Sequence, residues 1–157
     1  MAWPGIDQWV GGPFEPELEP LTWEEVQELA VRGWEIGSHT CTHPRLTELD
    51  EATLAGELEA SRQECERRLG APCASIAYPY GDYDQRVVAA TRRAGYACAA
   101  TLPARLHAPA VHEWPRIGVY HGDDARRFAL KVSPAARRLR GSALWPGLDT
   151  QRRRLRA

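Results

Sequence analysis

The sequence lacks the cysteine pattern of a disulfide-bonded or zinc-ribbon protein. Its four cysteines stand far apart, include no CxxC pair and do not crowd a short chain (Cys41, Cys65, Cys73 and Cys98). This spacing excludes a zinc ribbon or a disulfide framework as the organising element of the fold. We therefore expect four free thiols packed in the protein interior.

Long apolar runs are also missing. The amino terminus has no basic segment followed by an apolar stretch, so residues 1–157 contain no recognisable signal peptide. No apolar run approaches the roughly 20 residues that cross a bilayer, and we expect no membrane span. As written, the chain would stay in the cytoplasm, and the sequence leaves its location otherwise open.

An excess of one charge is absent as well. The chain has 20 Lys and Arg against 21 Asp and Glu, a net charge of -1, which gives no overall field to attract nucleic acid or anionic lipid. Glutamates dominate the first seventy residues, whereas the stretch from Arg126 onward is basic and ends in "QRRRLRA". We interpret 141–157 as a solvated basic tail, predict no nucleic-acid partner, and leave the oligomeric state open.

The length and composition fit one globular domain. A chain of 157 residues with 43% hydrophobic residues can build a real core, so we predict a single domain over 1–157. Residues 1–20 are rich in Pro, Gly and Trp and are predicted to be a loop-like lead-in. Domains seldom begin on such a loop, which suggests that the domain is truncated at its amino-terminal side.

Helical and strand patterns alternate along the chain. Thr22 and Glu25 form a capping box before the first helix, and Gly33 follows its end. The predicted helices cover 22–32, 50–69, 84–95, 123–132 and 133–141, and the predicted strands cover 34–37, 73–78, 96–102 and 116–120. Alternation of this kind predicts an α/β fold with a parallel sheet.

Two histidines four residues apart follow the first predicted strand, in "EIGSHTCTHP". His39 and His43 can point the same way from one helical turn, and neutral imidazole is a common ligand of zinc. Such a pair alone also occurs by chance on surfaces. Its place at a strand's carboxyl end, where loops often carry chemistry, favours a metal site. Cys41 lies between them off that face, and we interpret it as a packed thiol.

Two segments resemble a known family in the expected order. "GWEIGSHTCTHPRLTEL" resembles the metal-binding motif of the polysaccharide deacetylases, carbohydrate esterase family four, and "SIAYPYGDYD" resembles a later motif of the same family. One long amphipathic helix lies between them, and the resemblance covers roughly residues 20–135. It implies an incomplete version of the distorted (β/α) barrel of that family.

The resemblance also implies a chemistry and the residues that carry it. Such enzymes remove acetyl groups from N-acetylated sugars with a divalent metal ion, expected here to be zinc, held by one aspartate and two histidines. His39 and His43 match the two histidines. The backbone N–H of Tyr80 matches the donor to the oxyanion, and Pro79 and Gly81 complete a turn expected to contact the substrate.

The sequence departs from the family pattern in three places. The family's opening Asp-Asp motif, which supplies the base and the third ligand, should precede the first helix and is absent; Asp123 and Asp124 are adjacent but are better explained as helix caps. Ala77 stands where many members carry an arginine that orients the base. No histidine matches the general acid cleanly, and we interpret the candidates as exposed loop residues (His107, His112 and His121).

We therefore predict a metal-dependent N-deacetylase acting on an amino-sugar polysaccharide or glycan precursor. One alternative is an inactive deacetylase remnant that binds carbohydrate or a partner, with tryptophans as stacking surfaces (Trp3, Trp9, Trp23 and Trp34). Another is a structural metal-binding domain without chemistry. The sugar, the acetyl position and the ion are not determined by the sequence.

Overall fold

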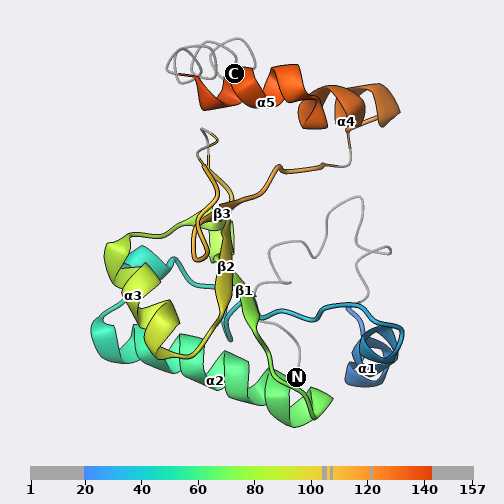
Figure 1. The fold of residues 1–157 in the computed structure, drawn as a ribbon. Helices are drawn as coiled ribbons and strands as arrows, with labels where there is room; N and C mark the ends of the chain where they lie inside the picture. The colour runs from blue at the N-terminus through green and yellow to red at the C-terminus, as the bar shows by residue number, and fades with distance from the viewer. Residues whose placement is uncertain (1–19, 104–105, 107, 121, 143–157) are drawn as a thin grey trace, which may run out of the picture.

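The structure is a computed structural model that describes residues 20–103, 106, 108–120 and 122–142. Three parallel strands form its sheet in the order β1 (Ser75–Ala77), β2 (Cys98–Thr101) and β3 (Trp114–Pro115). Beyond β1, on the side away from β2, Ser38 makes a single parallel bridge to Ile76. Figure 1 shows α2 below the sheet, α3 beside it, and α4 and α5 above it.

The helices begin and end where side-chain caps and glycines predict. Their bounds are α1 (Trp23–Val31), α2 (Glu51–Leu69), α3 (Gln85–Arg93), α4 (Ala125–Val132) and α5 (Pro134–Gly141). Thr22 and Glu25 form the predicted capping box, and Gly70 ends α2 in the left-handed conformation. The other N-caps are Asp50, Asp84, Asp124 and Ser133, whose side chains accept hydrogen bonds from the first turn of each helix.

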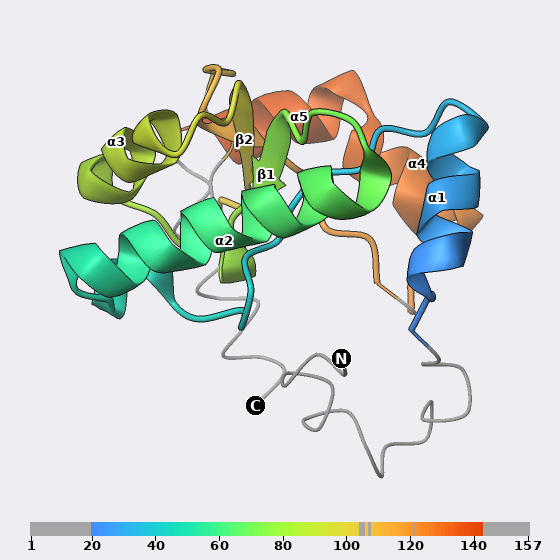
Figure 2. The same cartoon turned by 90° about the horizontal axis from the view of Figure 1, so that it is seen from below.

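The core lies between one face of the sheet and the helices α2 and α3. Figure 2 shows α2 crossing beneath the strands and α3 lying beside β2. Its fully buried members include Leu54 and Leu58 from α2, Val87 from α3 and Ile76 from β1. Successive strand residues alternate between this face and a half-exposed one, because side chains along a strand point to opposite sides. The second face carries small residues and remains partly open.

Two predicted strands are wrong. Residues 34–37 form no strand. The short strand β1 (Ser75–Ala77) pairs with this part of the chain only at Ser38, one residue after the predicted strand ends. The pairing predicted for 116–120 falls instead on Trp114 and Pro115. There the partner strand β2 ends at Thr101, whose carbonyl accepts the last hydrogen bond, 2.9 Å from the Arg116 N–H.

Two predicted features fall outside the described residues, namely most of the lead-in (1–20) and of the basic tail (141–157). The single-domain assignment over 1–157 stays a prediction. In the part of the chain that the structure describes, no helix combines the length and apolarity that a membrane span requires.

The turn after β1, η4 (Pro79–Gly81), needs glycine at position 81. Gly81 has φ +71°, and a Cβ built there would overlap the backbone of Leu102. Gly70 has a similar φ of +65°, but a Cβ there meets nothing within 4 Å. We expect Gly70→Ala to cost about 1–2 kcal/mol from the left-handed backbone alone, and Gly81→Ala to cost more because of the overlap.

Urea denaturation of the two variants measures this difference. Equal losses of unfolding free energy would show that the close approach to Leu102 does not constrain the turn.

Candidate metal and hydrolase site

The candidate site forms where two chain segments leave the sheet at the same edge. Ser38 pairs with Ile76, so the segment that follows Ser38 and the turn that follows β1 emerge side by side. His39 is the first residue beyond Ser38, and Tyr80 lies in the turn η4. The structure thus brings together the two motifs that are separated in sequence by the whole of α2.

The two histidines face one another at this edge. The Nε2 atoms of His39 and His43 lie 3.2 Å apart. The Nδ1 atom of His39 lies 2.6 Å from the carbonyl oxygen of Ala77. A carbonyl can only accept a hydrogen bond, so Nδ1 of His39 carries the proton and its Nε2 lone pair points toward His43.

This arrangement fits the needs of a bound divalent ion. Two nitrogens at 2.0–2.1 Å from a tetrahedral zinc ion lie about 3.3–3.4 Å apart, close to the observed separation. Histidine ligands usually donate their second N–H to a carbonyl or carboxylate, as His39 does to Ala77. Within the described residues no cluster of three His, Cys, Asp or Glu side chains is present, so these supply two of the ligands that such a site needs.

The surroundings favour the neutral form of both rings. Loss of solvation lowers the pKa of His39, and the nearby His43 and Arg116 lower it further, while the bond to the Ala77 carbonyl acts in the opposite direction. Loss of solvation also lowers the pKa of His43. Neutral imidazole is the form that binds metal, so both side chains are ready to act as ligands at neutral pH.

A carboxylate from α2 holds the loop that carries the histidines. The two oxygens of Glu57 accept hydrogen bonds from the Cys41 N–H at 2.8 Å, the Thr42 N–H at 3.0 Å and the Thr42 hydroxyl at 2.6 Å. The loop also places Thr40 and His43 at φ +71° and +56°, a conformation that costs free energy for residues other than glycine. The role of Glu57 could not be predicted, because nothing in the sequence separates it from the other glutamates of α2.

The turn η4 places an unused backbone donor beside the histidines. Tyr80 has φ +58°, and among the described residues nothing accepts a hydrogen bond from its N–H. Its ring packs edge-on against His43, with centroids 4.6 Å apart, and the guanidinium of Arg45 lies 4.7 Å from the ring centre. Pro79 is buried and Gly81 has no side chain, so the turn meets solvent through Tyr80 and its backbone.

A hollow of about 410 Å³ extends from His39 across the half-exposed face of the sheet. Small residues form its floor, and Trp114 and Arg116 stand at its side. Arg116 is half-buried, which lowers its pKa, and its Nε donates to the Thr101 carbonyl at 3.1 Å. Arg116 therefore brings a guanidinium to a site where Ala77 provides none. The position of Arg116 at the site was not predicted, because the sequence assigns Arg116 to a strand over 116–120, where its backbone would pair with a neighbouring strand.

Two predicted environments are wrong. Cys41 is exposed rather than packed, and its Sγ lies 3.8 Å from the backbone carbonyl of Glu57; of the four cysteines, which are all free, only Cys73 is buried. His112 is buried rather than exposed. Its Nε2 lies 3.0 Å from the Tyr96 carbonyl, at the amino end of β2 and thus at the opposite edge of the sheet from the candidate site.

The remaining candidates for a catalytic acid or base are two histidines and two aspartates. His107 and His121 lie outside the described residues. Asp124 caps α4 through the Arg127 N–H, and Asp123 accepts from the Tyr120 N–H and pairs with Lys131. The interpretation as a helix cap is confirmed for Asp124, whereas Asp123 does not cap α4 and instead holds the preceding turn and Lys131.

Several solved structures with a similar fold are deacetylases. The Streptococcus pyogenes deacetylase PplD, in complex with acetate, matches with a TM-score of 0.67 and 19% identity over 83% of this chain and 56% of that chain. A putative polysaccharide deacetylase of Bacillus anthracis matches with a TM-score of 0.65 and 25% identity over 75% of this chain and 38% of that chain. A polysaccharide deacetylase of Bacillus cereus matches with a TM-score of 0.63 and 26% identity over 74% of this chain and 38% of that chain.

These likenesses confirm the α/β fold with a partial barrel. The chain spans 56% and 38% of the lengths of the structures it matches, which is less than two thirds in each case. No curated protein matches the sequence. The family description "Polysaccharide deacetylase" matches residues 5–99, more than half of the chain, and includes both histidines and the turn η4. The chain therefore belongs to the polysaccharide deacetylase family.

Proposed function

We propose that the chain is part of a metal-dependent hydrolase that removes N-acetyl groups from an amino-sugar polysaccharide or glycan precursor. The observation that carries this proposal is the histidine pair, with its Nε2 atoms 3.2 Å apart and His39 fixed by the Ala77 carbonyl. Family membership supplies the reaction class. The metal and the substrate are our inference from the chemistry of the donor atoms.

His39 and His43 would hold the ion, which we propose to be zinc. A divalent ion, when bound, lowers the pKa of water and polarises a carbonyl, and hydrolysis of an amide at neutral pH needs both effects. Stable zinc sites use at least three protein ligands. We infer that a carboxylate completes the site, in keeping with the Asp-Asp motif of the family.

The other residues would act on the substrate itself. The N–H of Tyr80, for which no described residue provides an acceptor, would donate to the oxygen that becomes negative when the acetamide is attacked. The exposed rings of Tyr80 and Trp114 offer faces for sugars. The similar deacetylase PplD was solved in complex with acetate, the product expected from removal of an acetyl group, which supports this class of reaction.

A carbohydrate-binding module without catalysis is the second candidate. Trp34 and Trp114 are 66% and 58% exposed, more than a core role explains. The described residues also lack a third metal ligand. In this alternative the histidine pair would be a structural feature, with or without an ion.

Zinc titration of the purified chain tests the ligand assignment. We expect weak but measurable binding by calorimetry, reduced by roughly tenfold or more in both His39→Ala and His43→Ala. Cys41→Ser is the matched control within the same loop and should bind zinc as well as the unaltered chain. Zinc binding that depends on Cys41 and not on the histidines would refute the assignment.

Glu57 should support metal binding without touching the ion. Glu57→Ala removes the three hydrogen bonds that Glu57 accepts from Cys41 and Thr42, so we expect faster hydrogen exchange at the amides of these two residues. Because the loop then holds the histidines less firmly, we also expect the zinc affinity to fall about tenfold. Glu59→Ala, an exposed position on the same helix, is the control. Unchanged exchange in Glu57→Ala would show that the loop is held by other contacts.

Deacetylation itself is tested by incubating the zinc-loaded protein with an N-acetylglucosamine hexamer and measuring released acetate. We expect release that a chelator stops and that His43→Ala lowers by at least about 100-fold, while Glu59→Ala keeps it. Release that survives His43→Ala would exclude the proposed ligand. Binding of the hexamer without release would favour the carbohydrate-binding module.

A further inference from the structure

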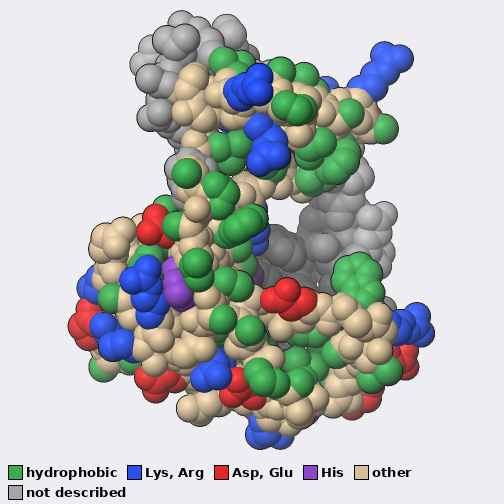
Figure 3. Space-filling view, viewed as in Figure 1, with side chains coloured by type: hydrophobic (Ala, Val, Ile, Leu, Met, Phe, Trp, Pro, Cys, Tyr) green, Lys and Arg blue, Asp and Glu red, His purple; other side chains and the backbone are tan. Residues whose placement is uncertain are grey.

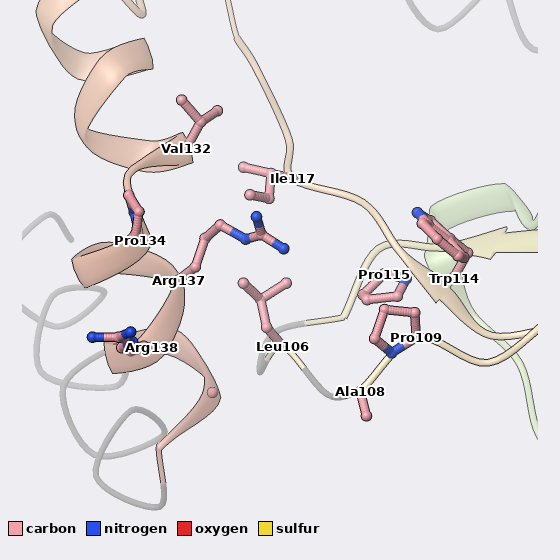
Figure 4. A pocket seen from close by; sticks show the side chains of 11 residues that line it. Leu106, Ala108, Pro109, Trp114, Pro115, Ile117, Val132, Pro134, Arg137 and Arg138 are labelled. Atoms are coloured by element: carbon pink, nitrogen blue, oxygen red, sulfur yellow. The ribbon is translucent and has the colours of Figure 1, made fainter.

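A second and larger cavity lies on the far side of Trp114 from the histidines. It has a volume of about 1080 Å³ and runs between the end of β3 and the helices α4 and α5. Its wall is mainly apolar and includes Leu106, Trp114, Ile117 and Val132. Figure 4 shows Trp114 with its neighbouring prolines at one end and α5 at the other.

Trp114 connects this cavity with the candidate site. The same side chain lines the large cavity and the hollow beside His39, and it is 58% exposed. A flat, rigid ring shared by two adjoining hollows suits the stacking of a sugar face. A polymer whose N-acetyl group lay at the histidines could therefore continue past Trp114 into the large cavity.

The polar groups at the α5 end of the cavity are positively charged. Arg137 and Arg138 line it, and no acidic side chain of the described residues does. Residues 125–142 contain six Lys and Arg and no Asp or Glu. Figure 3 shows basic and hydrophobic side chains interspersed over α4 and α5, with the acidic ones confined to the lower half of this face.

The two arginines differ in direction. In Figure 4 the guanidinium of Arg137 extends into the cavity toward Ile117 and Leu106, whereas Arg138 points away from them. Among the described residues the Arg137 side chain has no hydrogen-bond or ion-pair partner. A guanidinium over an apolar wall is suited to a planar anion, because its fork can donate two parallel hydrogen bonds to a carboxylate.

We propose that this cavity is a binding subsite for an acidic glycan, in which Arg137 pairs with a sugar carboxylate and Trp114 stacks on the neighbouring ring. The proposal deepens the proposed function, on which it rests, by assigning carboxylate-bearing amino-sugar polymers as substrates that bind more tightly than neutral ones. Arg137 is then a specificity-determining residue remote from the reacting bond.

The test compares binding of two oligomers that share N-acetylglucosamine. One is a hexasaccharide of alternating N-acetylglucosamine and glucuronate, and the other is the neutral N-acetylglucosamine hexamer. We expect Arg137→Gln to weaken binding of the acidic oligomer by about tenfold and to leave the neutral one unchanged, as loss of one charge-assisted pair predicts. Arg138→Gln, one residue along the same helix, should leave both unchanged.

Binding is measured by calorimetry on the zinc-free chain, so the result does not depend on catalysis. An equal loss in the two arginine variants would mean only a general effect of positive charge and would overturn the proposal. So would an unchanged affinity in Arg137→Gln, or failure of the acidic oligomer to bind. Failure of the deacetylation assay alone would remove the proposed reaction and leave the acidic-glycan subsite standing.

Discussion

The hydrogen bond between Nδ1 of His39 and the carbonyl of Ala77 is the contact on which the candidate site depends. It joins the loop after Ser38 to the end of β1, and it sets which nitrogen of His39 is free to bind an ion. Loss of this bond would leave the tautomer open and the ring able to rotate. The same carbonyl marks the point where the sheet ends and the turn with Tyr80 begins, so one contact aligns both motifs.

The strain at this edge is balanced by bonds from the body of the domain. Three non-glycine residues with positive φ, Thr40, His43 and Tyr80, all lie here. Glu57 holds the amides of the loop, and the Arg86 guanidinium donates to the carbonyls of Thr47 and Leu49 just beyond it, at 3.0 and 2.8 Å. Because α2 and α3 supply these side chains from the packed side of the sheet, the rigidity of the core is transmitted to the site.

The sequence predicted what local rules control. Capping residues and apolar spacing placed all five helices, and the motifs placed the histidines and the Tyr80 turn together. It failed where the outcome depends on a partner distant in sequence. The strands at 34–37 and 116–120 look extended, but a strand exists only where a neighbour pairs with it. The predicted burial of Cys41 and the predicted exposure of His112 were wrong for the same reason, because the elements that pack on a residue decide whether it is buried.

Arg116 brings a positive charge to the hollow beside His39 from the end of a different strand than the one that carries Ala77. An arginine on β1 at position 77 would stand beside the carbonyl that fixes His39, whereas Arg116 reaches the same hollow from the end of β3. Its half-buried charge lowers the pKa of His39 and opposes a cation at the histidines unless an anion lies between them. A carboxylate placed there would relieve this repulsion and add the third ligand at once. The positive charge of Arg116 thus opposes binding of the ion alone but favours binding of that carboxylate, so the ion and its third ligand should bind cooperatively.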